Sequence, residues 1–171
     1  IEDYLKLKRL DPSYKVFFDD GHIDVPANYQ ELKDLFESME EGSGDNLDLF
    51  ISQAEKKYKV GIQNLVYKPG LSIKEFIDRD TITGVFQLDI FKSMHSHIRK
   101  YFKNEKIIKL LEFPILFLGA TPKNTPALYS LMNFADIKLG TWFPEGGMYK
   151  IVEAMVELAQ EKGVKFYPSE E

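Results

Sequence analysis

The chain has 171 residues, of which 44% are hydrophobic and 29% charged, and its formal net charge is −5. These values fit one globular domain, or a piece of a larger one, and exclude wholesale disorder. The absence of cysteine excludes disulfides, thiolate zinc sites and cysteine nucleophiles, and the acidic balance argues against a general nucleic-acid binder. No apolar run reaches the ~18 residues that span a bilayer. Because the sequence starts at Ile1 rather than at a methionine, we expect an excised or processed segment.

The first part of the chain predicts a β-hairpin followed by a helix. Residues 14–18 and 22–25 are β-prone and flank Asp19-Asp20-Gly21, which is a strong hairpin signal. Asn28 is placed to cap a helix over 28–36, as the first residue of a capping box. This helix is followed by a turn-rich break.

Apolar residues recur at helical spacing through the rest of the chain, which predicts a series of helices. The predicted ranges are, in chain order, about 47–60, a short helix from Ser72, 85–103, 107–111 after a cap at Asn104, 126–134, and 148–162 ended by Gly163. The run 113–120 is nearly all apolar and predicts a buried segment or a pocket wall. Strands are predicted at 139–143 and 164–167. The predicted fold class is therefore mixed α+β, an antiparallel hairpin or sheet with a majority of helices.

Few residues suggest acid–base or metal chemistry. His95 and His97 stand two positions apart on a predicted helix, so they point to different sides and cannot chelate one metal together. We expect them to be surface histidines, and we expect no metal site. Glu75 and Asp78 could share a helix face and act as an acid–base pair if they were buried, but no sequence feature indicates burial. The catalytic residues stay unassigned.

The segment from Phe91 to Leu110 is basic, with six Lys or Arg side chains against Glu105 alone. Basic residues beside aromatic and aliphatic ones suit a helix that lies on an anionic membrane surface. The side chains that would contact such a surface are Lys92, Arg99, Lys100 and Lys103. The alternative is a helix that packs on the core with an ordinary basic outer face.

Gly146-Gly147 is the one double glycine, and it precedes the predicted helix at 148–162. Backbone N–H groups at such a position can meet an anion, although Glu145 beside them opposes a phosphate. No segment makes the G-x-G-x-x-G fingerprint or a P-loop. A free-standing nucleotide-binding domain is therefore not expected.

Two stretches together resemble the middle of bacterial phytoene desaturases, which are FAD-dependent carotenoid desaturases of the flavin amine-oxidase superfamily. The first is Phe113-Pro114-Ile115-Leu116-Phe117-Leu118-Gly119-Ala120-Thr121-Pro122 and the second is Gly140-Thr141-Trp142-Phe143-Pro144-Glu145-Gly146-Gly147-Met148. Leu10-Asp11-Pro12-Ser13-Tyr14 and Phe17-Phe18-Asp19-Asp20-Gly21 resemble an early hairpin of that family. The resemblance runs from about residue 10 to the end, and over 28–105 it is mainly one of pattern.

The resemblance implies that this chain is an internal fragment of a desaturase that dehydrogenates a C40 polyene. Residues 1–145 would be the substrate-binding and membrane-associating segment, and 146–171 a helix and strand that return to an absent FAD-binding domain. The parent enzyme would carry FAD, whereas the fragment alone would bind no cofactor and be inactive. It would work in the bacterial cytoplasm, peripheral to the inner face of the membrane, with the remainder of the parent chain as its partner.

A polyene hydrocarbon has no polar group, so its site must be a long apolar tunnel. The residues expected to bind the polyene are Phe117, Leu118, Tyr129, Trp142 and Phe143, with the last two near the flavin. Gly146 and Gly147 would let the backbone approach the cofactor closely. Two alternatives stay open: another flavoenzyme of the superfamily, such as a carotenoid isomerase or saturase, and a non-catalytic lipid- or membrane-binding module.

Overall fold

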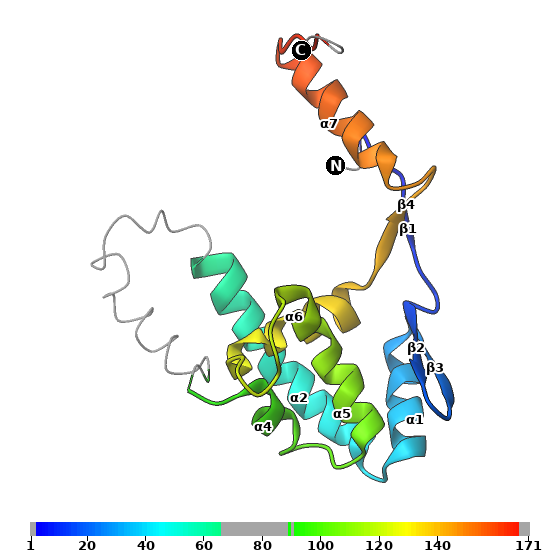
Figure 1. Cartoon of the computed structure of the whole chain (residues 1–171), viewed down its shortest axis with the longest axis vertical. Helices are drawn as coiled ribbons and strands as arrows, with labels where there is room; N and C mark the ends of the chain where they lie inside the picture. The colour runs from blue at the N-terminus through cyan, green and yellow to red at the C-terminus, as the bar shows by residue number, and fades with distance from the viewer. Residues whose placement is uncertain (1–2, 66–88, 90, 168–171) are drawn as a thin grey trace, which may run out of the picture.

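The computed structural model describes residues 3–65, 89 and 91–167. Within them, the helices before β4 form one packed body, two short two-stranded antiparallel sheets join it, and one further helix stands apart (Figure 1). The expected mixed α+β class is confirmed. The α-helices are α1 (Tyr29–Met39), α2 (Ser43–Tyr58), α4 (Met94–Ile98), α5 (Glu105–Glu112), α6 (Leu131–Phe134) and α7 (Tyr149–Glu161).

The predicted hairpin is present as β2 (Tyr14–Phe18) and β3 (Gly21–Val25), which pair in antiparallel register. Phe18 stands opposite Gly21, so Asp19 and Asp20 form a two-residue loop. Gly21 has a φ of 139°, a backbone conformation that side chains disfavour, which explains why a glycine is needed there. The hairpin lies beside α1 (Figure 1).

The first helix begins as expected, because the Asn28 side chain accepts hydrogen bonds from the backbone N–H groups of Gln30 and Glu31. The second helix begins four residues earlier than predicted, at Ser43. The reason is the carboxylate of Glu37, which accepts from the N–H groups of Gly42 at 2.8 Å and Gly44 at 2.9 Å. A side chain from α1 thus accepts hydrogen bonds from backbone N–H groups at the start of α2 that have no partner within the helix. The residues expected to form a break therefore form the start of a helix.

The core lies where α1, α2, α4 and α5 meet. Phe36, Phe50 and Phe102 are each at most 1% exposed and pack edge to face. Such aromatic contacts add to the free energy gained from burying the rings. The other fully buried large aliphatic side chains are Leu47, Met94, Ile98, Ile107, Ile108, Leu111 and Ile115.

The single long helix predicted over 85–103 is wrong in its described part, where only Met94–Ile98 is α-helical. The chain leaves the helix because Glu40, at the end of α1, binds the backbone N–H groups of Lys103 and Asn104. Asn104 then caps α5 at Glu105, two residues earlier than predicted. The predicted short helix from Ser72 lies outside the described residues.

After α5 the chain runs through η3 (Phe113–Leu118), a 3-10 helix, and then through η4 (Ala127–Ser130), α6 and η5 (Ala135–Leu139). The helix predicted over 126–134 is therefore present, although it is 3-10 at its start and continues as a π-helix. The strand predicted over 139–143 is shorter than expected: β4 is Trp142–Pro144, and it pairs with an unpredicted strand, β1 (Leu7–Arg9).

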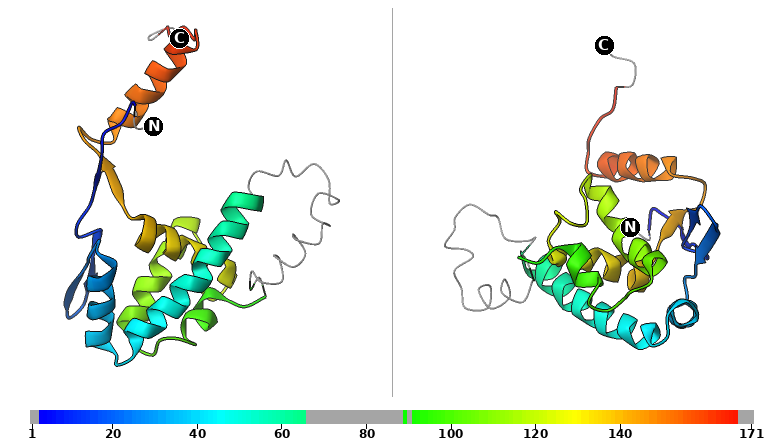
Figure 2. Two further views of the ribbon diagram at one scale, coloured as in Figure 1. Left: turned by 180° about the vertical axis from the view of Figure 1, so that it is seen from behind. Right: turned by 60° about the horizontal axis from the view of Figure 1, so that its bottom comes forward.

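The β1–β4 ribbon leads away from the helical body to α7, which stands apart from it (Figures 1 and 2). Helix α7 ends as predicted, and Gly163 follows with a φ of 83°. The strand predicted over 164–167 is wrong, because these residues have no regular structure. No strand in the described part of the chain lies beside them to supply a ladder of hydrogen bonds.

Candidate functional site

An apolar cavity of about 570 Å³ lies between β2, the end of α2, η3 and α6; we call it the η3 cavity. Its volume falls in the range of about 300–1,000 Å³ that is typical of small-molecule sites. The apolar run 113–120 supplies one wall, so the expectation of a pocket wall is confirmed. The large side chains that line it are Tyr14, Tyr58, Phe113, Phe117, Leu131 and Met132.

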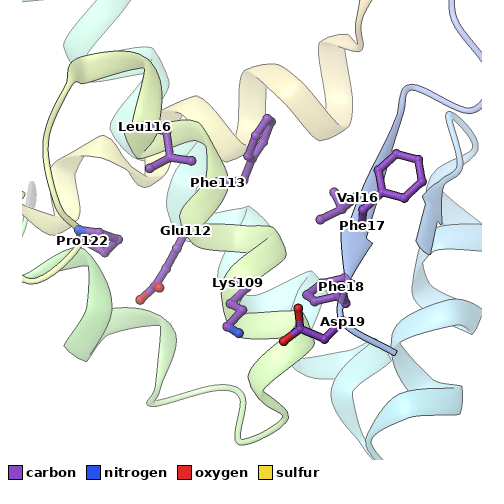
Figure 3. Close-up of a pocket in the computed structure, with 9 residues that line it drawn as sticks. All are labelled: Val16, Phe17, Phe18, Asp19, Lys109, Glu112, Phe113, Leu116 and Pro122. Carbon is purple, nitrogen blue, oxygen red and sulfur yellow. The ribbon is translucent and has the colours of Figure 1, made fainter. Parts of the chain in front are cut away.

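A second hollow, of about 430 Å³, lies between β2 and the α5–η3 segment; we call it the hairpin groove (Figure 3). Val16 and Phe18 line it from the strand, and Glu112 and Leu116 from the other side. Phe113 lines both hollows. The groove and the cavity therefore share the side chain of Phe113 in their walls.

Three aromatic rings form a continuous wall at this boundary. The ring centroids of Tyr14 and Phe113 are 5.3 Å apart, and those of Phe113 and Phe117 are 5.4 Å apart. Tyr14 comes from the hairpin and the two phenylalanines from η3, so the wall depends on how these elements pack together. The Tyr14 and Phe113 rings are tilted by 32° to each other, and the Phe113 and Phe117 rings meet edge to face at 75°. Together they give this boundary an apolar, aromatic surface.

One side of the η3 cavity is polar. The Tyr14 hydroxyl donates a 2.8 Å hydrogen bond to Oδ2 of Asp136, and the Thr141 hydroxyl donates a 3.3 Å bond to Oδ1. Burial raises the pKa of the Asp136 carboxyl, against the opposing effect of these two hydrogen bonds. Burial and the nearby carboxylate both raise the pKa of Tyr14, so its hydroxyl stays protonated and remains a donor.

Gly140, next to this polar side, is required by the packing of Arg9. Its φ is 87°, and a Cβ there would lie 2.5 Å from Cζ of Arg9. The guanidinium group donates to the Ala27 carbonyl at 3.0 Å and lies 5.9 Å from the Trp142 ring centroid. Arg9 thus fastens the β1–β4 ribbon to the body beside the cavity.

The structure brings only one of the five predicted polyene-binding residues into the cavity. Phe117 lines it and is also 74% exposed, so it stands at the rim. Leu118 is exposed next to it, and Tyr129 packs against the hydrophobic core. Trp142 and Phe143 lie on the β1–β4 ribbon and do not line the cavity. For these four residues, polyene binding stays a prediction.

The sequence analysis missed Tyr14, Asp136 and Thr141 as site residues. Tyr14 belongs to the predicted hairpin and Thr141 to the strand predicted over 139–143, but neither pattern says which distant residues they contact. Their meeting joins parts of the chain that are 122 positions apart. A single sequence carries no signal for such a contact.

The double glycine forms the sharp turn between β4 and α7. Gly146 and Gly147 have φ values of 90° and 98°, and a Cβ on Gly147 would have no heavy atom within 4 Å. A Cβ on Gly146 would lie 3.1 Å from the side chain of Lys150, so the open space is at Gly147 alone, and contact with a flavin stays a prediction. Glu145 beside the turn pairs with Lys6 at 2.7 Å.

Apolar side chains of the basic segment 91–110 pack into the helical body of the protein. Met94, Ile98 and Phe102 are buried, whereas Phe91 is 90% exposed. The predicted membrane-contacting side chains Lys92, Arg99, Lys100 and Lys103 belong to exposed residues. Two of them are paired: Lys92 with Asp89 at 2.7 Å, and Arg99 with Glu105 at 2.7 Å.

His95 and His97 differ in how far they are exposed to solvent. His95 is partly exposed, and its Nδ1 lies 2.7 Å from a carboxylate oxygen of Glu112. His97 is 1% exposed, so the expectation that both are surface histidines is wrong for it. His97 is buried because α4 packs against α2, which places its ring beside Phe50 and the buried Lys57 of that helix.

The described residues hold no cluster of three or more potential metal-ligating His, Asp or Glu side chains. Among them, no helix combines the length and the hydropathy that a membrane span requires.

The η3 cavity thus combines aromatic walls with one polar side. A comparison with models of known protein families finds no match. The carotenoid 3,4-desaturase of Haloarcula japonica is 36% identical over 166 residues, which is 96% of this chain and 34% of that protein. The zeta-carotene-forming phytoene desaturase of Myxococcus xanthus is 30% identical over 98% of this chain and 32% of that protein.

The 4,4'-diapophytoene desaturase of Staphylococcus aureus is 32% identical over 95% of this chain and 33% of that protein. The chain thus spans about a third of the length of these curated relatives. Over nearly its whole length it is homologous to carotenoid and phytoene desaturases, which confirms the family predicted from the sequence motifs.

Proposed function

We propose that this chain is the substrate-binding part of an FAD-dependent carotenoid desaturase, an enzyme that removes two hydrogens from a polyene. The η3 cavity, with its wall of aromatic rings, is the observation that carries the proposal, together with the homology to carotenoid desaturases. FAD, held mainly by the rest of the enzyme, would supply the redox chemistry by accepting a hydride. This chain would bind the polyene, orient it and exclude water.

Binding would rest on apolar contact, because a hydrocarbon polyene offers no charge or hydrogen-bonding group. The rings of Tyr14, Phe113 and Phe117 would pack along the conjugated chain. Burying apolar surface contributes about 25 cal/mol per Å², so a long polyene binds well without a polar anchor. Because Phe113 lines both the cavity and the hairpin groove, the polyene would pass along this ring.

The β1–β4 ribbon and α7 would connect this part to the FAD-binding part. One face of α7 leaves large apolar side chains exposed: Met148, Tyr149, Val152, Met155 and Leu158. Exposed apolar surface of this extent is typical of an interface. In this arrangement Trp142 and Phe143 lie at the entrance to the flavin, and Gly146 and Gly147 admit its edge.

Membrane contact would occur at the rim of the two hollows, on the cytoplasmic face of the bacterial membrane. Phe17, Leu116 and Phe117 are 75%, 62% and 74% exposed, and Phe17 and Leu116 also line the hairpin groove. A polyene could then pass from lipid into the cavity without crossing water. The exposed cations Lys92, Arg99, Lys100 and Lys103 would add attraction to anionic lipids.

The function is tested by expressing the complete reading frame in a bacterial host that accumulates phytoene, and by extracting the pigments. We expect products with two or more hydrogens fewer than the substrate. Phe113→Ala should lower this conversion by about tenfold or more, since it removes the shared wall of both hollows. Phe91→Ala, an exposed ring that does not line the η3 cavity, is the matched control. Products with an unchanged number of hydrogens would contradict a desaturase.

A further inference from the structure

The β1–β4 ribbon meets the helical body at Arg9, the last residue of β1. Arg9 stands opposite Trp142 of β4, and its guanidinium lies 5.9 Å from the centroid of the Trp142 ring. The same group donates to the Ala27 carbonyl, between the hairpin and α1, at 3.0 Å. It also lies close to Gly140, where a Cβ would be 2.5 Å from Cζ of Arg9. One side chain of β1 therefore meets the other strand of the ribbon and two separate segments of the body.

This junction carries a free-energy penalty that the end of a strand does not require. Nε of Arg9 is buried and has no hydrogen-bond partner among the described residues, which costs free energy. Gly140 has a φ of 87°, so the chain beside Arg9 adopts a conformation that side chains disfavour. Local features that lower stability in this way are typical of functional sites.

The ribbon also lies between the cavity and the double-glycine turn. Gly140 and Thr141, which come directly before β4, line the η3 cavity, and Gly146 and Gly147 follow β4. In the proposed function the polyene lies in the cavity and the flavin lies beyond the ribbon, so the direction of the ribbon sets the distance between them. Hydride transfer needs the reacting atoms about 3–3.5 Å apart, and a displacement of about 1 Å can cost roughly 100-fold in rate.

We propose that Arg9 is a positioning residue for hydride transfer: it fixes the direction of the β1–β4 ribbon, and with it the alignment of the bound polyene with the flavin. This inference rests on the proposed function and adds to it a residue that does not line the η3 cavity. Arg9 acts through its contacts with Ala27 and Trp142. Because a planar guanidinium both donates and packs on an aromatic ring, the compact ammonium of a lysine does not replace it.

The experiment uses the complete flavoenzyme and a C40 polyene in phospholipid vesicles, without oxygen. Rapid mixing gives the limiting rate of flavin reduction and, from its dependence on polyene concentration, the apparent Kd. We expect Arg9→Ala and Arg9→Lys each to lower the limiting rate by about 10- to 100-fold and to change the apparent Kd by no more than about twofold. Reduction of the flavin by dithionite, which needs no polyene, should keep its wild-type rate.

Lys8→Ala is the matched control, because it removes a positive charge from the exposed neighbouring position of the same strand. It should keep the wild-type rate and affinity. A wild-type rate in either Arg9 variant, a weaker affinity that explains the whole loss, or loss of bound flavin in both variants would overturn the inference and leave the desaturase proposal intact. A wild-type enzyme whose flavin no polyene reduces would contradict the proposed function itself.

Discussion

The ammonium nitrogen of Lys57 lies 3.3 Å from Nε2 of His97 inside the helical body, and the two residues are 3% and 1% exposed. Because an ammonium group can only donate, Nε2 accepts and His97 is neutral, with its proton on Nδ1. Lys57 also donates to the carbonyl of Ala127 at 3.1 Å and pairs with Asp89 at 3.2 Å. This one lysine therefore joins α2 to α4 and η4.

Replacing Lys57 with methionine should destabilise the chain by about 3 kcal/mol. The substitution keeps the length of the side chain but removes the lysine that joins three acceptors, the Ala127 carbonyl, Asp89 and Nε2 of His97. Ser130 still donates to the carbonyl and Lys92 still pairs with Asp89, so the loss comes mainly from the buried end of the network. Urea unfolding followed by circular dichroism measures the loss. Lys56→Met, at the exposed neighbouring position, is the control and should change stability by no more than about 0.5 kcal/mol. A similar stability for both variants would contradict the role assigned to Lys57.

Acidification should destabilise the chain through His97. Burial and the nearby Lys57 lower the pKa of His97 to about 4, against 6.5 for the free side chain. The unfolded chain therefore takes up this proton at a higher pH, so stability is complete above pH ~6.5 and is lost as the pH falls toward ~4. We expect a loss of about 2 kcal/mol between pH 7.5 and pH 5.

The pH dependence is measured as the free energy of unfolding at several pH values. In His97→Leu the change between pH 7.5 and pH 5 should shrink by most of this amount. His22→Asn removes an exposed histidine of the hairpin and should leave it unaltered. If His97→Leu kept the wild-type slope, other groups would be responsible.

The two asparagine caps should differ in their contribution to stability. Asn28→Ala removes the cap of α1 and should destabilise by about 1 kcal/mol. Asn104→Ala removes the cap of α5 together with a 3.0 Å hydrogen bond from its side-chain amide to the Met39 carbonyl. We expect the second loss to be larger by roughly 1 kcal/mol. Equal losses in thermal unfolding would show that the Met39 contact contributes nothing.

A methyl group at Gly140 should displace Arg9. Gly140→Ala places a Cβ 2.5 Å from the guanidinium carbon, and the positive φ adds backbone strain. Gly119→Ala has a positive φ of 63° with open space around it, so it reports the strain alone. We expect Gly140→Ala to be the more destabilising by about 1–3 kcal/mol.

The double variant Gly140→Ala, Arg9→Ala separates the steric effect from other losses. Removing the guanidinium relieves the clash, so the two changes together should cost less than the sum of the single ones. Additive losses in urea unfolding would mean that Arg9 moves aside freely and does not hold the β1–β4 ribbon in place.

Features that depend on neighbouring residues could be predicted from the sequence. The hairpin closes at Gly21 because of its backbone conformation, and Asn28 caps α1 through donors two and three residues away. The helix at 148–162 follows from its own apolar periodicity and ends just before Gly163. In each of these cases the determining atoms are close in the sequence.

The elements that were predicted wrongly depend instead on residues that are distant in the sequence. The long helix expected over 85–103 ends at Ile98 because Glu40, 63 positions away, binds the backbone of Lys103. Helix α2 starts early because Glu37 of α1 reaches over to Gly42. The strand expected over 164–167 would need a neighbouring strand, which no local pattern can supply.

The sequence by itself determined the mixed fold class, the relation to carotenoid desaturases, and the apolar run at 113–120 that forms a pocket wall. Only the tertiary structure decided that Tyr14, Phe113 and Asp136 meet at one cavity and that His97 is buried against Lys57. The physical reason is that periodicity and capping act over a few residues. A cavity, by contrast, is formed by side chains that only the packing of distant segments brings together.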